Sequence, residues 1–181
     1  MSFESGKSMA SIGALFLVIG SFVPFLSLVG IMLLLIGLRS LAQYYNDNGI
    51  FQNALYAVIF GIIGIVAAGV VLVSLFFGGL FAAGAFLGLA AGIIAALVVA
   101  FIFYILMALY FRRTFDSLAD KSGQGMFRTA GLLLLIGAVL TIVIVGLILI
   151  FVAWLLVTIA FFSMTPATKS QPPPPPPPSQ T

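Results

Sequence analysis

From Ala54 to Phe111 the sequence carries no charged residue, and this apolar stretch limits what the chain can fold into. A soluble domain has no place for an apolar run of this length. The whole chain agrees, with 63% hydrophobic and 6% charged residues and a mean hydropathy of +1.33. The runs lack the period-two alternation of a membrane β-strand. We therefore expect an all-α, polytopic transmembrane helical bundle, because helices satisfy their own backbone hydrogen bonds in lipid.

The residue types that usually carry chemistry are scarce. The chain has no cysteine, no histidine and four acidic residues. It therefore lacks disulfides, thiol nucleophiles, imidazole bases and the commonest metal ligands. An intramembrane or interfacial enzyme would have to use Asp116, Asp120 and Lys121. We expect no enzyme activity, no catalytic residue, no cofactor, no metal and no nucleic-acid partner.

The first apolar block leaves two topologies open. Met9–Leu38 is too long for one untilted helix across a hydrocarbon core of about 30 Å, and Pro24 lies near its middle. This proline either kinks a single helix or opens the second arm of a hairpin. The arms of that hairpin would run from Gly6 to Phe22 and from Ser27 to Tyr45.

The other blocks raise the same question. The stretch from Ala54 to Phe111 is expected to break at Gly78-Gly79 into two spans. Thr129–Met164 is again too long for one helix, so we expect a hairpin that turns near Gly146. If both terminal blocks are short hairpins, the bundle has six membrane segments. If each crosses once, it has four.

The basic residues favour six segments. With four crossings, Lys7 and Lys169 lie opposite the other five basic residues. With six, all seven fall on one side, as the positive-inside rule requires. We therefore expect a multi-pass protein of the plasma membrane with both termini in the cytoplasm. The predicted positive-inside anchors are Lys7, Arg39, Arg112, Arg113, Lys121 and Arg128.

A short motif occurs twice, once in each polar loop, 39–53 and 112–128. It predicts two parallel repeats, about 27–77 and 93–145, related by an axis along the membrane normal. Both fall within a single membrane domain, 1–164. The repeated residues are Ser40, Leu41, Ala42, Gly49, Phe51 and Ala54 in the first copy, and Ser117, Leu118, Ala119, Gly125, Phe127 and Ala130 in the second.

Two further stretches have distinctive composition. Gly84, Gly88 and Gly92 recur every four residues, so they share one helical face on which another helix can approach closely. We expect a helix-packing face there, used by another span, a second copy or a membrane-protein partner. After residue 164 the composition changes to a proline-rich tail, 165–181, which we expect to be disordered.

Several of these stretches resemble a known family. They are 40–46, 50–56, Phe127–Gly131 and the run from Ile136-Gly137-Ala138 to Ala160-Phe161-Phe162. They are similar to an uncharacterised, chiefly archaeal multi-pass family, domain of unknown function 996. The resemblance covers Gly6 to Met164 and excludes the proline tail. It implies a membrane protein of unknown activity and supplies no catalytic or binding residues.

Two functional hypotheses follow. The first is a structural or accessory membrane component that packs with itself or with a partner in the lipid bilayer. The second is a small transporter or channel for a neutral or apolar solute, since ion carriers normally keep a charged group at membrane depth and the uncharged spans have none.

Overall fold

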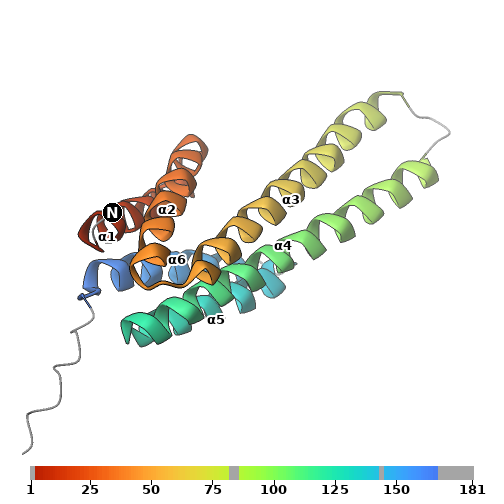
Figure 1. Ribbon diagram of the computed structural model, residues 1–181. Helices are drawn as coiled ribbons and strands as arrows, with labels where there is room; N and C mark the ends of the chain where they lie inside the picture. Colours follow the sequence, from red (N-terminus) through yellow and green to blue (C-terminus); the bar gives the residue numbers. More distant parts are fainter. Residues whose placement is uncertain (1–2, 82–85, 143–144, 167–181) are drawn as a thin grey trace, which may run out of the picture.

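The computed structural model describes residues 3–81, 86–142 and 145–166, and this part of the chain folds into six α-helices without a strand. They are α1 (Phe3–Gly20), α2 (Pro24–Tyr44), α3 (Asn48–Phe81), α4 (Phe86–Ser122), α5 (Gly125–Val139) and α6 (Val145–Ser163), with a short 3-10 helix η1 (Leu140–Ile142) between the last two. Figure 1 shows the helices in chain order. The predicted all-helical class is confirmed, and the six predicted segments are present as helices. The predicted disordered tail falls almost entirely outside the described residues.

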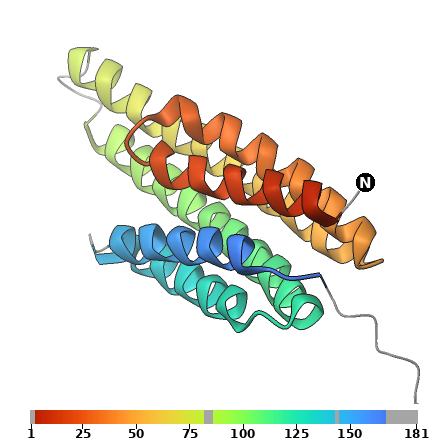
Figure 2. The same cartoon turned by 90° about the vertical axis from the view of Figure 1, so that its left-hand side faces the viewer.

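The helices pair as three antiparallel hairpins, α1–α2, α3–α4 and α5–α6, and the hairpins join into a closed ring. Within the described residues each helix contacts its neighbours in the sequence, and α6 also contacts α1. Figure 2 shows α1 beside α6. Both terminal blocks are therefore hairpins of two helices rather than single long helices.

The first hairpin turns just before Pro24, as predicted from the position of this proline. Pro24 is at the start of α2, where its missing N–H and fixed φ suit a helix N-terminus. The turn pairs its own backbone groups: the Ser21 N–H donates to the Val18 carbonyl, and the Phe22 and Val23 N–H groups donate to the Ile19 carbonyl. Such internal pairing allows a turn in an apolar surrounding.

The first polar loop is much shorter than the predicted 39–53. α2 continues to Tyr44 and α3 begins at Asn48. The turn is made by Asn46, whose φ of 55° is tolerated by asparagine, and by a hydrogen bond from the Asp47 N–H to the Ala42 carbonyl. The polar residues that suggested a long loop lie on the surfaces of the helices instead.

The second polar loop, predicted over 112–128, contains only Gly123 and Gln124. α4 continues through the charged residues to Ser122, and Gly123 ends it with a φ of +70° and an N–H bond to the Ala119 carbonyl. This is the left-handed cap that glycine favours after a helix.

Two predicted breaks are displaced. Gly78-Gly79 does not end a helix, because α3 continues to Phe81; glycine is tolerated in membrane helices, where water does not compete for the backbone. The last hairpin turns slightly before Gly146, which lies in the first turn of α6. A Cβ there would lie 2.3 Å from the Leu140 carbonyl carbon, so glycine allows the turn to close.

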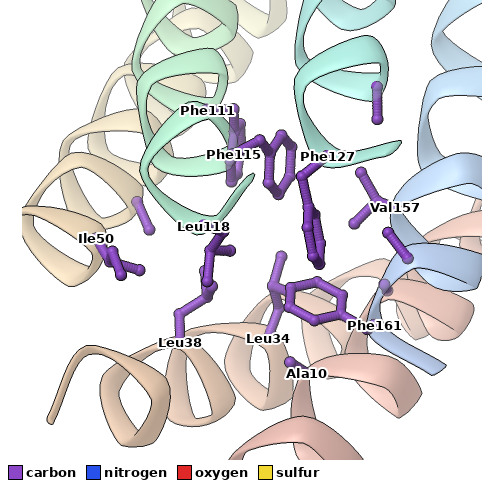
Figure 3. Packing of buried hydrophobic residues seen from close by; sticks show 14 of the residues in the cluster. Ala10, Leu34, Leu38, Ile50, Phe111, Phe115, Leu118, Phe127, Val157 and Phe161 are labelled. Carbon is purple, nitrogen blue, oxygen red and sulfur yellow. The ribbon is translucent and has the colours of Figure 1, made fainter. Parts of the chain in front are cut away.

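The centre of the ring is filled with side chains from all six helices (Figure 3). Phe115 stacks on Phe127 with ring centroids 6.2 Å apart, and Phe127 meets Phe161 edge-on at 4.8 Å. All three are fully buried. The ring is therefore a packed core rather than an open channel.

By length and composition, four helical stretches could cross a membrane: Pro24–Tyr44, Asn48–Ser74, Ala90–Ser122 and Val145–Ser163. α5 is a shorter apolar helix. The α3–α4 hairpin is far longer than the other two and extends beyond them (Figure 1).

Candidate functional site

All charged side chains in the described residues lie towards one end of the bundle, which we call the charged end. It is the end where α1, α3 and α5 begin and α2, α4 and α6 finish. A contact of 3.9 Å between Lys121 Nζ and Asp47 Oδ2 ties α4 to the first loop. The Gln124 side chain donates a hydrogen bond of 2.8 Å to the Ser163 carbonyl. The six predicted positive-inside anchors are thus brought together, as the hairpin topology requires.

The anchors use different partners. Arg112 pairs with Asp116 one helical turn away, 3.7 Å apart, and Arg128 pairs with Asp120 at 2.5 Å. Arg113 instead lies over the Tyr110 ring at 5.2 Å. Arg39 likewise lies 5.9 Å over the Phe51 ring. Half-exposed pairs of this kind contribute little to stability, which suits a hydrated membrane boundary.

Two tyrosines pack against the start of α1 at the charged end. The Phe3 ring lies 4.9 Å from Tyr44 and 6.4 Å from Tyr45, and the two tyrosine rings are 5.0 Å apart. The Tyr45 hydroxyl is buried and has no hydrogen-bond partner among the described residues, although its ring is half-exposed. Burial, with a smaller contribution from Tyr44, raises the pKa of Tyr45 to about 12.

Tyr45→Phe is expected to preserve stability at neutral pH and to flatten its fall in alkali. The raised pKa means that the folded state keeps Tyr45 neutral while the unfolded state loses its proton near the ordinary value of 10.0. Stability from this group is therefore full below pH 10 and declines between pH 10 and 12. Thermal unfolding between pH 8 and pH 11, compared with Tyr56→Phe as the control, measures the difference. Equal alkaline slopes for wild type and Tyr45→Phe would contradict it.

The repeated motif occupies two similar places at the charged end. Ser40 to Ala42 lie in the last turns of α2 and Gly49 to Ala54 in the first turns of α3. In the second copy, Ser117 to Ala119 lie near the end of α4 and Gly125 to Ala130 in the first turns of α5. Burial matches at three of the six paired positions and differs at the other three; Phe127, for example, is buried, whereas Phe51 is half-buried. The matching buried pairs are Leu41 with Leu118, Ala42 with Ala119, and Ala54 with Ala130.

Seven residues after the last residue of each copy lies a glycine, Gly61 or Gly137, that faces the helix following its own. A Cβ at Gly61 would lie 2.9 Å from Met107 of the following helix, and one at Gly137 would lie 2.8 Å from Ile150 of the helix that follows it. Yet α3 and α5 differ greatly in length. The parallel repeat stays a prediction, supported at the loops rather than along the spans.

The predicted glycine face lies at the far end of the long hairpin. Gly84 is outside the described residues, and Gly88 belongs to α4. Gly92 is exposed, and a Cβ there would meet nothing within 4 Å. No helix of the described chain therefore packs on Gly92, and its use by a second copy or a partner stays a prediction.

The tightest helix contact is one that the sequence analysis missed. In the α1–α2 hairpin, a Cβ at Gly13 would lie 2.4 Å from the Leu34 nitrogen, and one at Gly37 would lie 2.4 Å from the Ala10 nitrogen. The signal was a spacing of seven residues in each arm, which keeps glycine at one seam. The seam glycines are Gly6, Gly13 and Gly20 in α1, and Gly30 and Gly37 in α2.

A cavity of about 340 Å³ lies between α3, α4 and η1. Its lining is almost entirely apolar and includes Gly61, Gly64, Ala68, Leu97, Tyr104 and Thr141. The Thr141 hydroxyl donates a hydrogen bond to the Gly137 carbonyl. With this almost entirely apolar lining, the cavity suits an apolar occupant. No group of three metal-ligating side chains gathers in the described residues.

With this arrangement established, comparison with known proteins gives the family. A model described as "Protein of unknown function (DUF996)" matches residues 26–155, from α2 into α6. The chain belongs to the DUF996 family. The resemblance read from the sequence is confirmed, although the matched region is narrower than Gly6 to Met164 and leaves out α1.

A relative extends the similarity beyond the DUF996 match. The uncharacterized protein MJ1644 of Methanocaldococcus jannaschii is 33% identical over 183 residues, covering 94% of this chain and 98% of the relative. No solved structure matches the chain. Membership in DUF996 together with the apolar helices makes this a membrane protein of a family whose function is unknown.

Proposed function

We propose that this protein is a structural or accessory component of the plasma membrane that acts by packing rather than by catalysis. The observation that carries the proposal is the filled centre of the ring, where Phe115, Phe127 and Phe161 leave no aqueous path. In support, most charged side chains of the described residues form ion pairs or lie over aromatic rings near one end, an arrangement typical of anchoring.

The proposed partner surface is the glycine face on the free part of α4. Gly92→Leu is expected to leave the fold unchanged, because a Cβ at this position would meet nothing within 4 Å, yet to separate a second copy or partner that approaches there. Ala90→Leu, about half a turn away on α4, is the control. Chemical cross-linking in membranes and oligomer size in mild detergent should fall for Gly92→Leu alone. Unchanged association in both variants would contradict a packing role for this face.

A second candidate is a small transporter for a neutral or apolar solute, and the apolar cavity beside Tyr104 favours it. The two candidates separate experimentally. Reconstituted vesicles that accumulate an apolar solute, with uptake reduced by Gly64→Phe inside the cavity and not by Gly69→Phe outside it, would favour transport. Association through α4 without such uptake would favour the structural role.

We further propose that the charged end faces the cytoplasm, because it gathers the lysines and arginines of the described residues. Single cysteines at Ser2, Asn48, Ser122 and Ser170 are expected to be protected from an impermeant thiol reagent in intact cells and labelled in inverted membranes. The chain has no cysteine of its own to interfere. Labelling of Asn48→Cys and Ser122→Cys in intact cells would reverse the orientation.

A further inference from the structure

The exposed charges of α4 mark where the hydrocarbon of the membrane begins. Arg112 and Asp116 lie about 15 Å and about 9 Å along the helix from its end at Ser122, and their side chains are 37% and 35% exposed. Charged groups facing lipid tails are costly, and an aspartate side chain is too short to reach back to water. The hydrocarbon therefore starts beyond Arg112, at a depth that we call the boundary level.

Contacts with α4 identify the boundary level on α5 and α6. A Cβ at Gly131 would lie 3.2 Å from the Arg112 Cα, and the Trp154 ring lies 5.4 Å from Phe111. From Gly131 the chain continues for only about 17 Å to the end of η1, and α6 extends about 14 Å from Trp154 back to its start. The hairpin thus reaches about half the depth of a hydrocarbon core of about 30 Å.

The turn of the α1–α2 hairpin lies beside the first half of α6. The Phe22 ring in its turn lies 6.2 Å from Phe151, which is about 5 Å beyond Trp154 along α6. Phe22 and Phe25 are 79% and 73% exposed. A turn that reached the opposite surface would present these rings to water or headgroups, whereas a turn inside the hydrocarbon places them in lipid.

Among the described helices, only those of the central hairpin are long enough to cross from the boundary level. From Arg112 to the start of α4 at Phe86 is about 39 Å, and α3 runs beside it. Figure 1 shows this hairpin extending well past the other turns, and its sides there carry exposed apolar residues such as Ile65 and Ile94.

We infer that α1–α2 and α5–α6 end inside the leaflet next to the charged end, and that only α3–α4 crosses the bilayer. Six helices, each about 10 Å wide, then occupy one leaflet and two occupy the other. The molecule is a wedge that expands one leaflet and prefers membranes convex towards its charged end. This inference rests on the proposed structural role and specifies that role as shaping or sensing of the bilayer.

The native tryptophan tests the depth directly, since the chain has only one. In vesicles with lipids brominated at set depths, Trp154 is expected to be quenched most strongly by bromines near the headgroups. A fully crossing α6 would place Trp154, which is near its middle, at the bilayer centre and reverse the order. The double variant Trp154→Phe with Leu140→Trp should show the opposite pattern, with strongest quenching by the deepest bromines. Either pattern reversed would overturn the inference.

Orientation in vesicles tests the wedge. Ser122→Cys, at the charged end, reports by impermeant thiol labelling how many molecules face outward. The outward fraction should be larger in small, highly curved vesicles than in large ones, because their outer leaflet is the more expanded. Equal fractions would overturn the wedge. Both readouts need only the isolated chain, so a failure of partner association in Gly92→Leu bears on the proposed function and not on this depth assignment.

Discussion

Gly13→Leu is expected to break the α1–α2 hairpin, while Gly69→Leu on α3 leaves the protein intact. At Gly13 even a Cβ would lie 2.4 Å from the Leu34 nitrogen and 2.8 Å from the Gly30 carbonyl oxygen, so backbone atoms would have to move. At Gly69 a Cβ meets nothing within 4 Å. Overpacking in ordinary cores costs about 1–3 kcal/mol, and backbone contacts cannot be relieved by a rotamer change.

The comparison is best made in detergent, by thermal unfolding and by the fraction of monodisperse protein. Gly69→Leu controls for the general effect of a larger apolar side chain in a membrane helix. Gly64→Ala gives a second control, since its nearest neighbours would lie at an ordinary 3.6 Å. Similar losses for Gly13→Leu and Gly69→Leu would show that the seam does not hold the hairpin together.

Phe161→Ala is expected to destabilise the bundle strongly, and Phe162→Ala hardly at all. Phe161 is fully buried and meets Phe127 edge-on at 4.8 Å, whereas the next residue, Phe162, is 55% exposed. Truncating a core phenylalanine costs up to about 3–5 kcal/mol, largely through the cavity it leaves. In lipid, the cost of leaving a cavity remains even where the side chain is not transferred from water on folding.

Unfolding by a graded mixture of denaturing and mild detergent measures this difference. The two variants remove the same side chain from adjacent positions of α6, so expression and helix propensity are matched. Phe127→Ala, on the other side of the same contact, should reproduce the loss, and the double variant should cost less than the sum of the two. Equal stability for Phe161→Ala and Phe162→Ala would contradict the assignment of the core.

Some of this structure is predictable from the sequence because lipid imposes simple rules. The helical class follows from the long uncharged runs, and the hairpin at Pro24 follows from the length of Met9–Leu38 and the preference of proline for a helix start. With helices paired as hairpins, the charged residues between the apolar runs must gather at one end of the bundle, and in the described residues they do.

Other features need three-dimensional information. Gly78-Gly79 reads as a break by the rules of soluble proteins, yet α3 passes through it because glycine can remain helical in lipid. The two polar loops are overestimated, since charged residues such as Arg112 and Asp116 also occur on helix surfaces. The seven-residue spacing of the seam glycines is visible in the sequence. Composition alone, however, does not show which of the many glycines contact another helix.

The closed ring has a consequence for synthesis. The surface of α1 is completed by α6, which leaves the ribosome after the other five described helices, so the first hairpin must remain in the membrane with that side uncovered until α6 has been made. Early chains can therefore form the glycine seam between Gly13 and Gly37 locally, but not the final arrangement. A chain shortened before Val145 would lack α6, so the contact between α6 and α1 could not form. Quality-control proteases would then have access to an incomplete bundle.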